Sequence, residues 1–252
     1  MNKPQLFILA LFLLLLGSCQ SYQHFVKEEG QYYQLNSSEH QEADSSTAAI
    51  YAPYKKQLEA KMNEQLGQLD VDLIKEQPES NMGNFTADMV AVQAQLYTGQ
   101  SIDFAVLNYG GLRLPSIPKG PLKKGKIYEL LPFDNMIVVV ELKGSELPAL
   151  FEHICMKGGW PVSAAVRMQM DDEFAPHNIS LEGQAIVPDQ NYRIATIDYL
   201  ANGGDNCSFF KGKKRYETGK FLRDAAIEYI SAQTAKGKTI KARKEGRISQ
   251  KK

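Results

Sequence analysis

Two glycine-containing segments carry the side chains best suited to hold a ligand. They are residues 108–113 (Asn-Tyr-Gly-Gly-Leu-Arg) and residues 199–205 (Tyr-Leu-Ala-Asn-Gly-Gly-Asp). Glycine lets the atoms of another molecule approach the main chain closely. Arg113 offers a planar fork of donors suited to phosphate, and Asp205 is an acceptor suited to a ribose diol. Phe133 and the tyrosine of the second segment could stack on the faces of a base, so the pattern predicts a nucleotide site.

Each segment taken alone is also consistent with an ordinary turn after a buried strand. Asp205 could equally cap a helix or turn, as aspartate after glycine often does. The two segments together favour a site. The candidate binding residues are Asn108, Gly110, Gly111, Arg113, Phe133, Tyr199, Asn202, Gly203, Gly204 and Asp205.

No catalytic or metal-binding residue is predicted in this chain. Its histidines occur singly, without the spacing of a metal site, and an isolated histidine is more often a surface or core residue than a ligand. They are His24, His40, His153 and His177. Neither a Ser-His-Asp arrangement nor a phosphate-cradling Walker loop is present.

The elements that must position these residues mix helices and strands without regular alternation, which favours a single α+β domain. Apolar periodicity predicts a helix over 51–69, which Gly67 weakens or ends, and a helix over 87–96 that begins at Asn84 or Thr86 and ends at Gly99. The remaining expected helices are 146–157 and 221–234. Strands or extended segments are expected at 104–107, 127–131, 136–142, 162–170, 178–182 and 193–198, with a loop at 119–126.

Several ordered motifs between residues 50 and 248 resemble the C-terminal domain of the 5′-nucleotidase family. They are residues 79–84 (Glu-Ser-Asn-Met-Gly-Asn), 108–113, 131–135 (Leu-Pro-Phe-Asp-Asn), 192–196 (Tyr-Arg-Ile-Ala-Thr) and 199–205. The resemblance implies that Asn108 reaches the base edge, that Arg113 holds phosphate or the sugar beside it, and that Asp205 binds ribose. It also implies that Phe133 and Tyr199 stack on the base.

One departure concerns phosphate. Some relatives carry a phosphate-binding arginine shortly before the Glu-Ser-Asn-Met-Gly-Asn motif, whereas this chain has Lys75-Glu76-Gln77-Pro78 there. Weaker phosphate binding is therefore expected. Glu79 and Asn81 of the motif itself are expected to order loops.

In the family, hydrolysis is performed by a separate metallophosphoesterase domain whose metal ions activate water. This chain shows none of its signatures, so the resemblance implies that divalent metals and catalysis belong to a partner chain. The leading hypothesis is a nucleotide-recognition domain of a 5′-nucleotidase-type hydrolase in nucleotide catabolism, with no cofactor of its own. The alternatives are a stand-alone surface lipoprotein that binds nucleotides or nucleosides, and a scaffold with an inactive site.

The N-terminus resembles a bacterial lipoprotein signal. Lys3 precedes an apolar run over 6–16 that is too short to span a bilayer. Leu16-Gly17-Ser18-Cys19 resembles a lipobox, which makes Cys19 the expected lipidation site, although a plain secretory signal is the alternative. The expected organisation is a signal over 1–18, a polar tether over 19–49 and the domain over 50–250. The expected location is the bacterial cell envelope, lipid-anchored and facing the periplasm or the surface.

The 29 acidic and 29 basic residues cancel, which disfavours binding to a nucleic acid polymer. The lysines within 119–126 could attract phosphate, but a solvated surface is the commoner use of such a cluster. Cys155 and Cys207 could form a disulfide or remain two separate thiols, because sequence does not show their separation.

Overall fold

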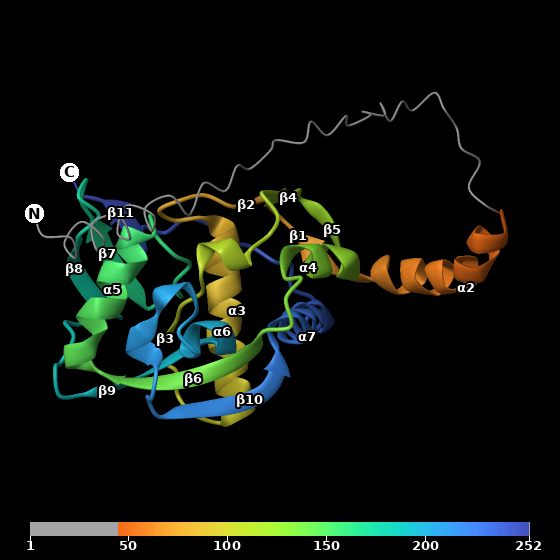
Figure 1. Cartoon of the computed structure of the whole chain (residues 1–252). Coiled ribbons are helices and arrows are strands. Elements are labelled where there is room, and N and C mark those ends of the chain that lie inside the picture. Colours follow the sequence, from red (N-terminus) through yellow and green to blue (C-terminus); the bar gives the residue numbers. More distant parts are fainter. Residues whose placement is uncertain (1–44, 252) are drawn as a thin grey trace, which may run out of the picture. The chain divides into compact units, whose positions relative to one another are not determined.

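The computed structural model describes residues 45–251, and residues 1–44 and 252 are left undescribed (Figure 1). The predicted signal over 1–18, the lipidation site Cys19 and most of the predicted tether therefore lie outside the described residues. The chain divides into two units, Met1–Ala48 and Ala49–Lys252. None of the helices between residues 45 and 251 combines the length and apolar content needed to span a bilayer.

The described part of the chain mixes helices with short strands. The helices are α2 (Ser45–Met62), α3 (Asn81–Thr98), α4 (Lys124–Leu130), α5 (Leu147–Met156), α6 (Asp198–Ala201) and α7 (Leu222–Ala235), with short 3₁₀ turns η1 (Tyr109–Gly111), η2 (Gly144–Glu146), η3 (Gly204–Asn206) and η4 (Ser208–Phe210). The strands are β1 (Gln65–Leu69), β2 (Leu73–Ile74), β3 (Phe104–Ala105), β4 (Ser116–Ile117), β5 (Gly120–Lys123), β6 (Met136–Lys143), β7 (Val166–Met170), β8 (Pro176–Leu181), β9 (Asn191–Ile197), β10 (Arg215–Phe221) and β11 (Ile248–Gln250). The predicted α+β class is confirmed.

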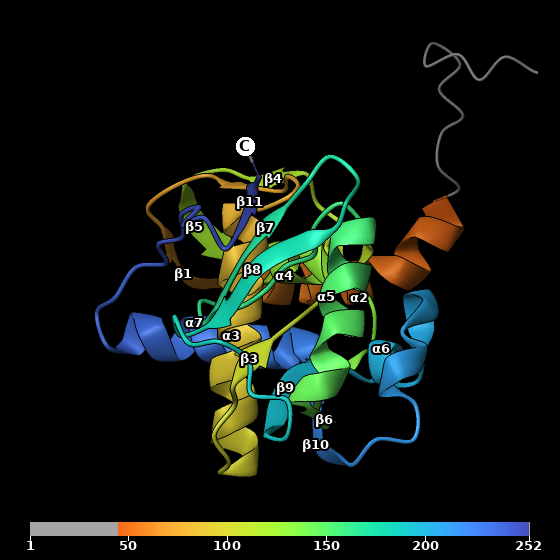
Figure 2. The same ribbon diagram turned by 90° about the vertical axis from the view of Figure 1, so that its left-hand side faces the viewer.

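The main sheet has the order β10-β6-β9-β3, in which β3 runs parallel to β9 and the other neighbours are antiparallel. A second sheet has the order β11-β7-β8, and β1-β5 and β2-β4 form two small pairs. Helix α3 runs through the middle of the unit and packs against α7 and the main sheet (Figures 1 and 2). The core thus lies between α3 and the main sheet.

Strand β6 shows why this sheet is central. Its residues from Ile137 to Val140 are all fully buried, so both faces of the strand are covered. A continuous β-branched run suits such a strand, since each large side chain that leaves water contributes about 1.5–3 kcal/mol to folding. The predicted strand over 136–142 is confirmed.

Helix α3 has clear signals at both ends. The Ser80 side chain accepts a hydrogen bond from the Gly83 amide at 2.9 Å, which caps the first turn. Gly99 ends the helix in the left-handed conformation with φ 66°, where glycine has no steric penalty. The predicted end at Gly99 is confirmed, but the helix begins at Asn81, earlier than predicted, because the cap at Ser80 recruits the whole first turn.

The predicted helix over 51–69 is confirmed as far as Met62 and is wrong beyond it. Helix α2 ends at Met62, and Gln65–Leu69 forms β1, which pairs antiparallel with β5. Leu66 and Leu69 continue a helical spacing in the sequence, yet both are buried as strand residues. Tertiary pairing overrides local periodicity here.

Two further expectations are corrected by the structure. Residues 127–131 are not extended, because α4 runs from Lys124 to Leu130 and buries Ile127 and Leu130 at helical spacing. The expected loop over 119–126 contains β5 and the first turn of α4. Strands β10 and β11 have no counterpart among the expected strands, and β10 is an edge strand with alternating charges and a register shift between Glu217 and Phe221.

Candidate functional site

Three loops meet at one edge of the main sheet, and the strand directions explain why. Strands β3 and β9 are parallel, with Ala105 opposite Ala195, so the loops that follow them leave from the same edge. Strand β6 is antiparallel to β9, with Ile137 opposite Ile197, so the loop before β6 arrives at that edge too. The topology therefore brings residues 108–113, 131–135 and 199–205 together.

These loops enclose a cavity of about 330 Å³. Its lining residues are Asn108, Gly110, Gly111, Arg113, Phe133, Asn135, Tyr199 and Asp205. Asn135 is not among the predicted binding residues, although it belongs to the Leu-Pro-Phe-Asp-Asn motif that supplies Phe133. The other lining residues are all among the sequence candidates.

Asp205 is the centre of a small polar network. Its carboxylate accepts hydrogen bonds from Asn108 Nδ2 at 2.7 Å and from the Tyr199 hydroxyl at 2.8 Å. Because a carboxylate only accepts, Nδ2 of Asn108 must face Asp205. Oδ1 of Asn108 is then buried without a hydrogen-bond partner in the described part of the chain, and a Cβ added at Gly111 would lie 2.7 Å from it. Asn108 thus orients Asp205, and its contact with a base edge stays a prediction.

The two aromatic rings are unusually exposed. Phe133 is 47% exposed and Tyr199 is 43% exposed, and both line the cavity. The Tyr199 ring stands on Gly204, where an added Cβ would lie 2.5 Å from ring atom Cζ. Asp198 ties the two aromatic loops together, because its Oδ1 accepts from the amides of Tyr199 at 2.8 Å and Met136 at 3.1 Å.

Two cations at this site have no ion-pair partner among residues 45–251. Arg113 is exposed, its Nη1 donates to Gly110 O at 3.4 Å, and its guanidinium lies 5.7 Å from the Phe133 ring centroid. Lys75 donates to Leu112 O at 2.7 Å. Burial, followed by the charge of Arg113, lowers the pKa of Lys75. Like charges held together without a counter-ion favour an anionic ligand.

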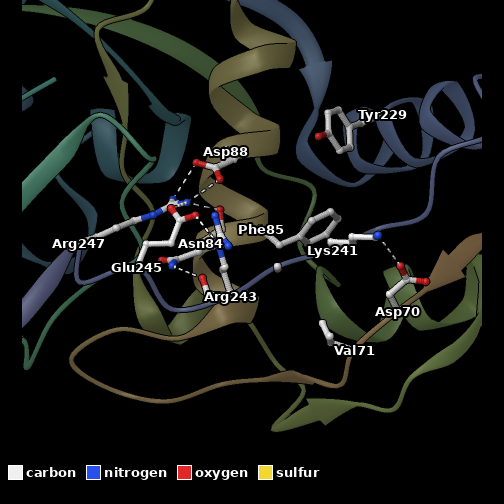
Figure 3. Close-up of a pocket in the computed structure, with 11 residues that line it drawn as sticks. Asp70, Val71, Asn84, Phe85, Asp88, Tyr229, Lys241, Arg243, Glu245 and Arg247 are labelled. Carbon is white, nitrogen blue, oxygen red and sulfur yellow. Dashed lines mark hydrogen bonds and ion pairs between the residues drawn. The ribbon is translucent and has the colours of Figure 1, made fainter.

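A larger cavity of about 690 Å³ lies elsewhere, between α3, α7 and the segment before β11 (Figure 3). Its cations are already paired. Arg247 meets Asp88 at 2.7 Å and Glu245 at 3.1 Å, and Lys241 meets Asp70 at 3.2 Å. This balance of charge makes the larger cavity the poorer phosphate site, despite its size.

The sequence segment that forms the 330 Å³ cavity matches a known protein family. The family model described as 5′-nucleotidase, C-terminal domain, matches residues 65–212. This chain belongs to that family. The match includes every residue that lines the 330 Å³ cavity.

Relatives of this 5′-nucleotidase C-terminal domain are much longer proteins. The trifunctional nucleotide phosphoesterase protein YfkN of Bacillus subtilis is 28% identical over 232 residues, which cover 84% of this chain and 16% of that protein. Protein UshA of Escherichia coli is 30% identical over 206 residues, which cover 80% of this chain and 36% of that protein. The solved 5′-nucleotidase precursor from Thermus thermophilus superimposes with a TM-score of 0.69 and 28% identity, covering 82% of this chain and 43% of that one. The chain thus spans less than half the length of each.

Some predicted residues shape the loops of this 5′-nucleotidase C-terminal domain without lining the cavity. Asn202 turns outward, and its Oδ1 accepts from Arg215 at 2.7 Å. Gly203 has φ 91°, and a Cβ there would lie 2.1 Å from Lys211 Cε. The tyrosine ring that covers Gly204 leaves it no room for a side chain. These positions determine the path of the loop, and a direct ligand contact by them stays a prediction.

The loop of Asp205 is supported from behind by His153. This ring is 6% exposed and lies 5.0 Å from the Trp160 ring and 5.5 Å from the ring of Phe209, which follows Asp205 in the chain. Burial lowers the pKa of His153, so the neutral ring is favoured. The sequence presents this residue only as an isolated histidine, because its partners are distant along the chain.

The structure decides between a disulfide and two separate thiols for the two cysteines. Cys155 and Cys207 are both free and buried. Burial raises the pKa of Cys155 to about 11 and that of Cys207 to about 12. Both are therefore unreactive thiols near neutral pH.

The described residues offer no grouping suited to a metal. Between residues 45 and 251, no three or more His, Cys, Asp or Glu side chains are gathered closely enough to hold a metal ion. Glu79 and Asn81 order loops, as expected: Glu79 accepts from the amides of Glu245 and Gly246, and Asn81 accepts from the amide of Ile74 at 2.7 Å.

Proposed function

We propose that this domain recognises a nucleotide for a 5′-nucleotidase-type hydrolase in nucleotide catabolism. The observation that carries the proposal is the cavity formed by the three loops. It presents two exposed aromatic rings, a carboxylate oriented by Asn108, and the Arg113 guanidinium, which has no ion-pair partner among residues 45–251. A base can stack on Phe133 or Tyr199, a ribose diol can donate to Asp205, and phosphate can be held by Arg113.

Phosphate recognition distinguishes this proposal from simple nucleoside capture. Arg113 has no ion-pair partner among the described residues, and Lys75 lies close enough for the charge of Arg113 to depress its pKa. Lys75 also lies over the Tyr109 ring at 3.9 Å. These charges support a phosphorylated ligand. They offset the absence of the phosphate-binding arginine that some relatives carry before the Glu-Ser-Asn-Met-Gly-Asn motif. A stand-alone surface receptor for nucleosides would instead bind adenosine and AMP equally.

We also propose that catalysis takes place on a metallophosphoesterase chain that supplies the divalent metals. This part extends the family resemblance, since hydrolysis in that family needs metal-activated water. In the same proposal the domain is anchored to the bacterial envelope by lipid at Cys19. The described domain would then deliver bound nucleotide to the metals of its partner.

The recognition proposal is tested by the melting temperature of the full chain with AMP, adenosine and ribose 5-phosphate. A ligand at a hundred times its Kd stabilises the folded state by about 2.7 kcal/mol. AMP is expected to raise the melting temperature most, adenosine less, and ribose 5-phosphate least because it lacks a base. No rise with either AMP or adenosine would refute recognition.

The partner proposal needs a separate assay. The purified chain is incubated with AMP and Mg²⁺, Mn²⁺ or Zn²⁺, and released phosphate is measured with and without a co-purified metallophosphoesterase. Phosphate release is expected only with the partner. Hydrolysis by this chain alone would show that the non-catalytic assignment is wrong.

A further inference from the structure

The loop that carries Phe133 is held by an arginine that does not line the cavity. Nη1 of Arg223 donates to the carbonyl of Leu131 at 3.3 Å and to that of Pro132 at 3.2 Å. Nη2 donates to the Asp134 carboxylate at 2.6 Å. One guanidinium therefore forms hydrogen bonds to the chain on both sides of Phe133.

Arg223 is itself held firmly. Its side chain is 14% exposed, and its guanidinium lies 4.5 Å from the Tyr128 ring centroid. It belongs to the first turn of α7, where the neighbouring amide of Leu222 donates to Asn135 O at 2.8 Å. Helix α7 thus fixes the loop through both its backbone and its arginine.

Apart from the contacts made by α7, Phe133 has the Arg113 guanidinium 5.7 Å from its ring centroid. Its side chain is 47% exposed, and its backbone makes no hydrogen bond to any other residue in the described range. A free loop would have to be ordered when a ligand binds, which weakens affinity. A loop already fixed by Arg223 avoids that loss.

We propose that Arg223 is a positioning residue of the nucleotide site, which holds the loop of Phe133 so that the ring stays at the cavity where a base would stack. This inference rests on the proposed nucleotide recognition. Lysine cannot replace the arginine, because a single ammonium group lacks the planar fork that reaches acceptors on both sides of Phe133. Arg223 acts through Phe133 and does not touch the ligand.

The test is a double-mutant cycle in the full chain, with AMP affinity measured by calorimetry. The variants are Arg223→Lys, Arg223→Ala, Phe133→Ala and the double variant Arg223→Ala/Phe133→Ala. Each change at Arg223 is expected to weaken AMP binding about three- to tenfold, which corresponds to ordering the loop on binding. In the Phe133→Ala background, the same change should produce no further loss of affinity.

Stability is followed in parallel, because a purely structural role would lower the melting temperature in both backgrounds and weaken binding in both. If Arg223→Ala fails to fold, Asp134→Ala serves as a second variant. It removes the carboxylate that accepts from Arg223, and the Asp134 side chain is 73% exposed. AMP binding should weaken in this variant too. Arg193→Ala, which loses contacts to Glu141 and Ser101, is the matched control and should leave affinity unchanged.

Equal losses of affinity with and without Phe133 would overturn the inference, as would unchanged affinity in Arg223→Lys and Asp134→Ala. A wild-type chain that binds neither AMP nor adenosine would instead refute the proposed function, and the positioning role with it. A wild-type chain that binds AMP but shows additive variants would refute the positioning role alone.

Discussion

The change of Phe133 to alanine tests the stacking role most directly. Base stacking on an aromatic side chain is worth about 1–3 kcal/mol, so AMP affinity should fall about 5- to 150-fold. The stability of the fold should depend less on this ring, because the ring is already 47% exposed in the free protein. Losing roughly half of the 1.5–3 kcal/mol of a buried phenylalanine should cost about 1 kcal/mol of stability.

The assay is isothermal calorimetry with AMP, alongside thermal unfolding. The melting temperature of Phe133→Ala should fall by about 2–4 °C, as expected for about 1 kcal/mol in a domain of this size. Phe174→Ala is the matched control, since Phe174 is 48% exposed and is not among the residues lining the cavity. Unchanged affinity in Phe133→Ala, or an equal loss in Phe174→Ala, would refute the stacking argument.

Further predictions follow from individual contacts. Gly204→Ala should abolish AMP binding while the domain still folds, because the added Cβ would lie 2.5 Å from the Tyr199 ring; calorimetry and circular dichroism check this. Arg113→Met should weaken AMP by about 1.5–3 kcal/mol and barely affect adenosine, as measured by competition. His153 has a lowered folded pKa, so the unfolded chain binds its proton first and stability is lost as pH falls below the unfolded value; His153→Gln should flatten that part of a denaturation profile. Ser80→Ala should remove the cap on α3 and about 1 kcal/mol of unfolding free energy in urea titrations.

Much of the domain could be predicted from sequence, and the failures have physical causes. The end of α3 follows from Gly99, since a left-handed residue stops a helix wherever the chain goes next. By contrast, Leu66 and Leu69 have the spacing of a helix, and pairing with β5 overrides that local pattern. Ile127 and Leu130 have helical spacing, but the segment 127–131 is too short for periodicity to distinguish a helix from a strand.

The candidate site, like the fold, could be predicted from sequence only in part. Asn108, Phe133 and Asp205 stand in recognisable motifs, and the structure brings them around one cavity. Arg223 and Lys75 stand in no such motif. Their contacts join residues far apart in sequence, with separations of 89 residues for Arg223 and Asp134 and 37 for Lys75 and Leu112. Local patterns carry no information about such pairs.

The parallel pairing of β3 and β9 has a consequence for how the cavity can adapt. The loops of Asn108 and Asp205 grow from adjacent strands that share a ladder, and their side chains are bonded to each other. These two loops form one side of the cavity and are held to each other by both the ladder and the side-chain hydrogen bond. The Phe133 loop leads into β6 on the other side of β9, and its position depends on contacts with α7 that a substitution at Arg223 would change. Relatives that accept bulkier or smaller bases should therefore differ first in the contacts that hold the Phe133 loop, and not in the glycine segments 108–113 and 199–205.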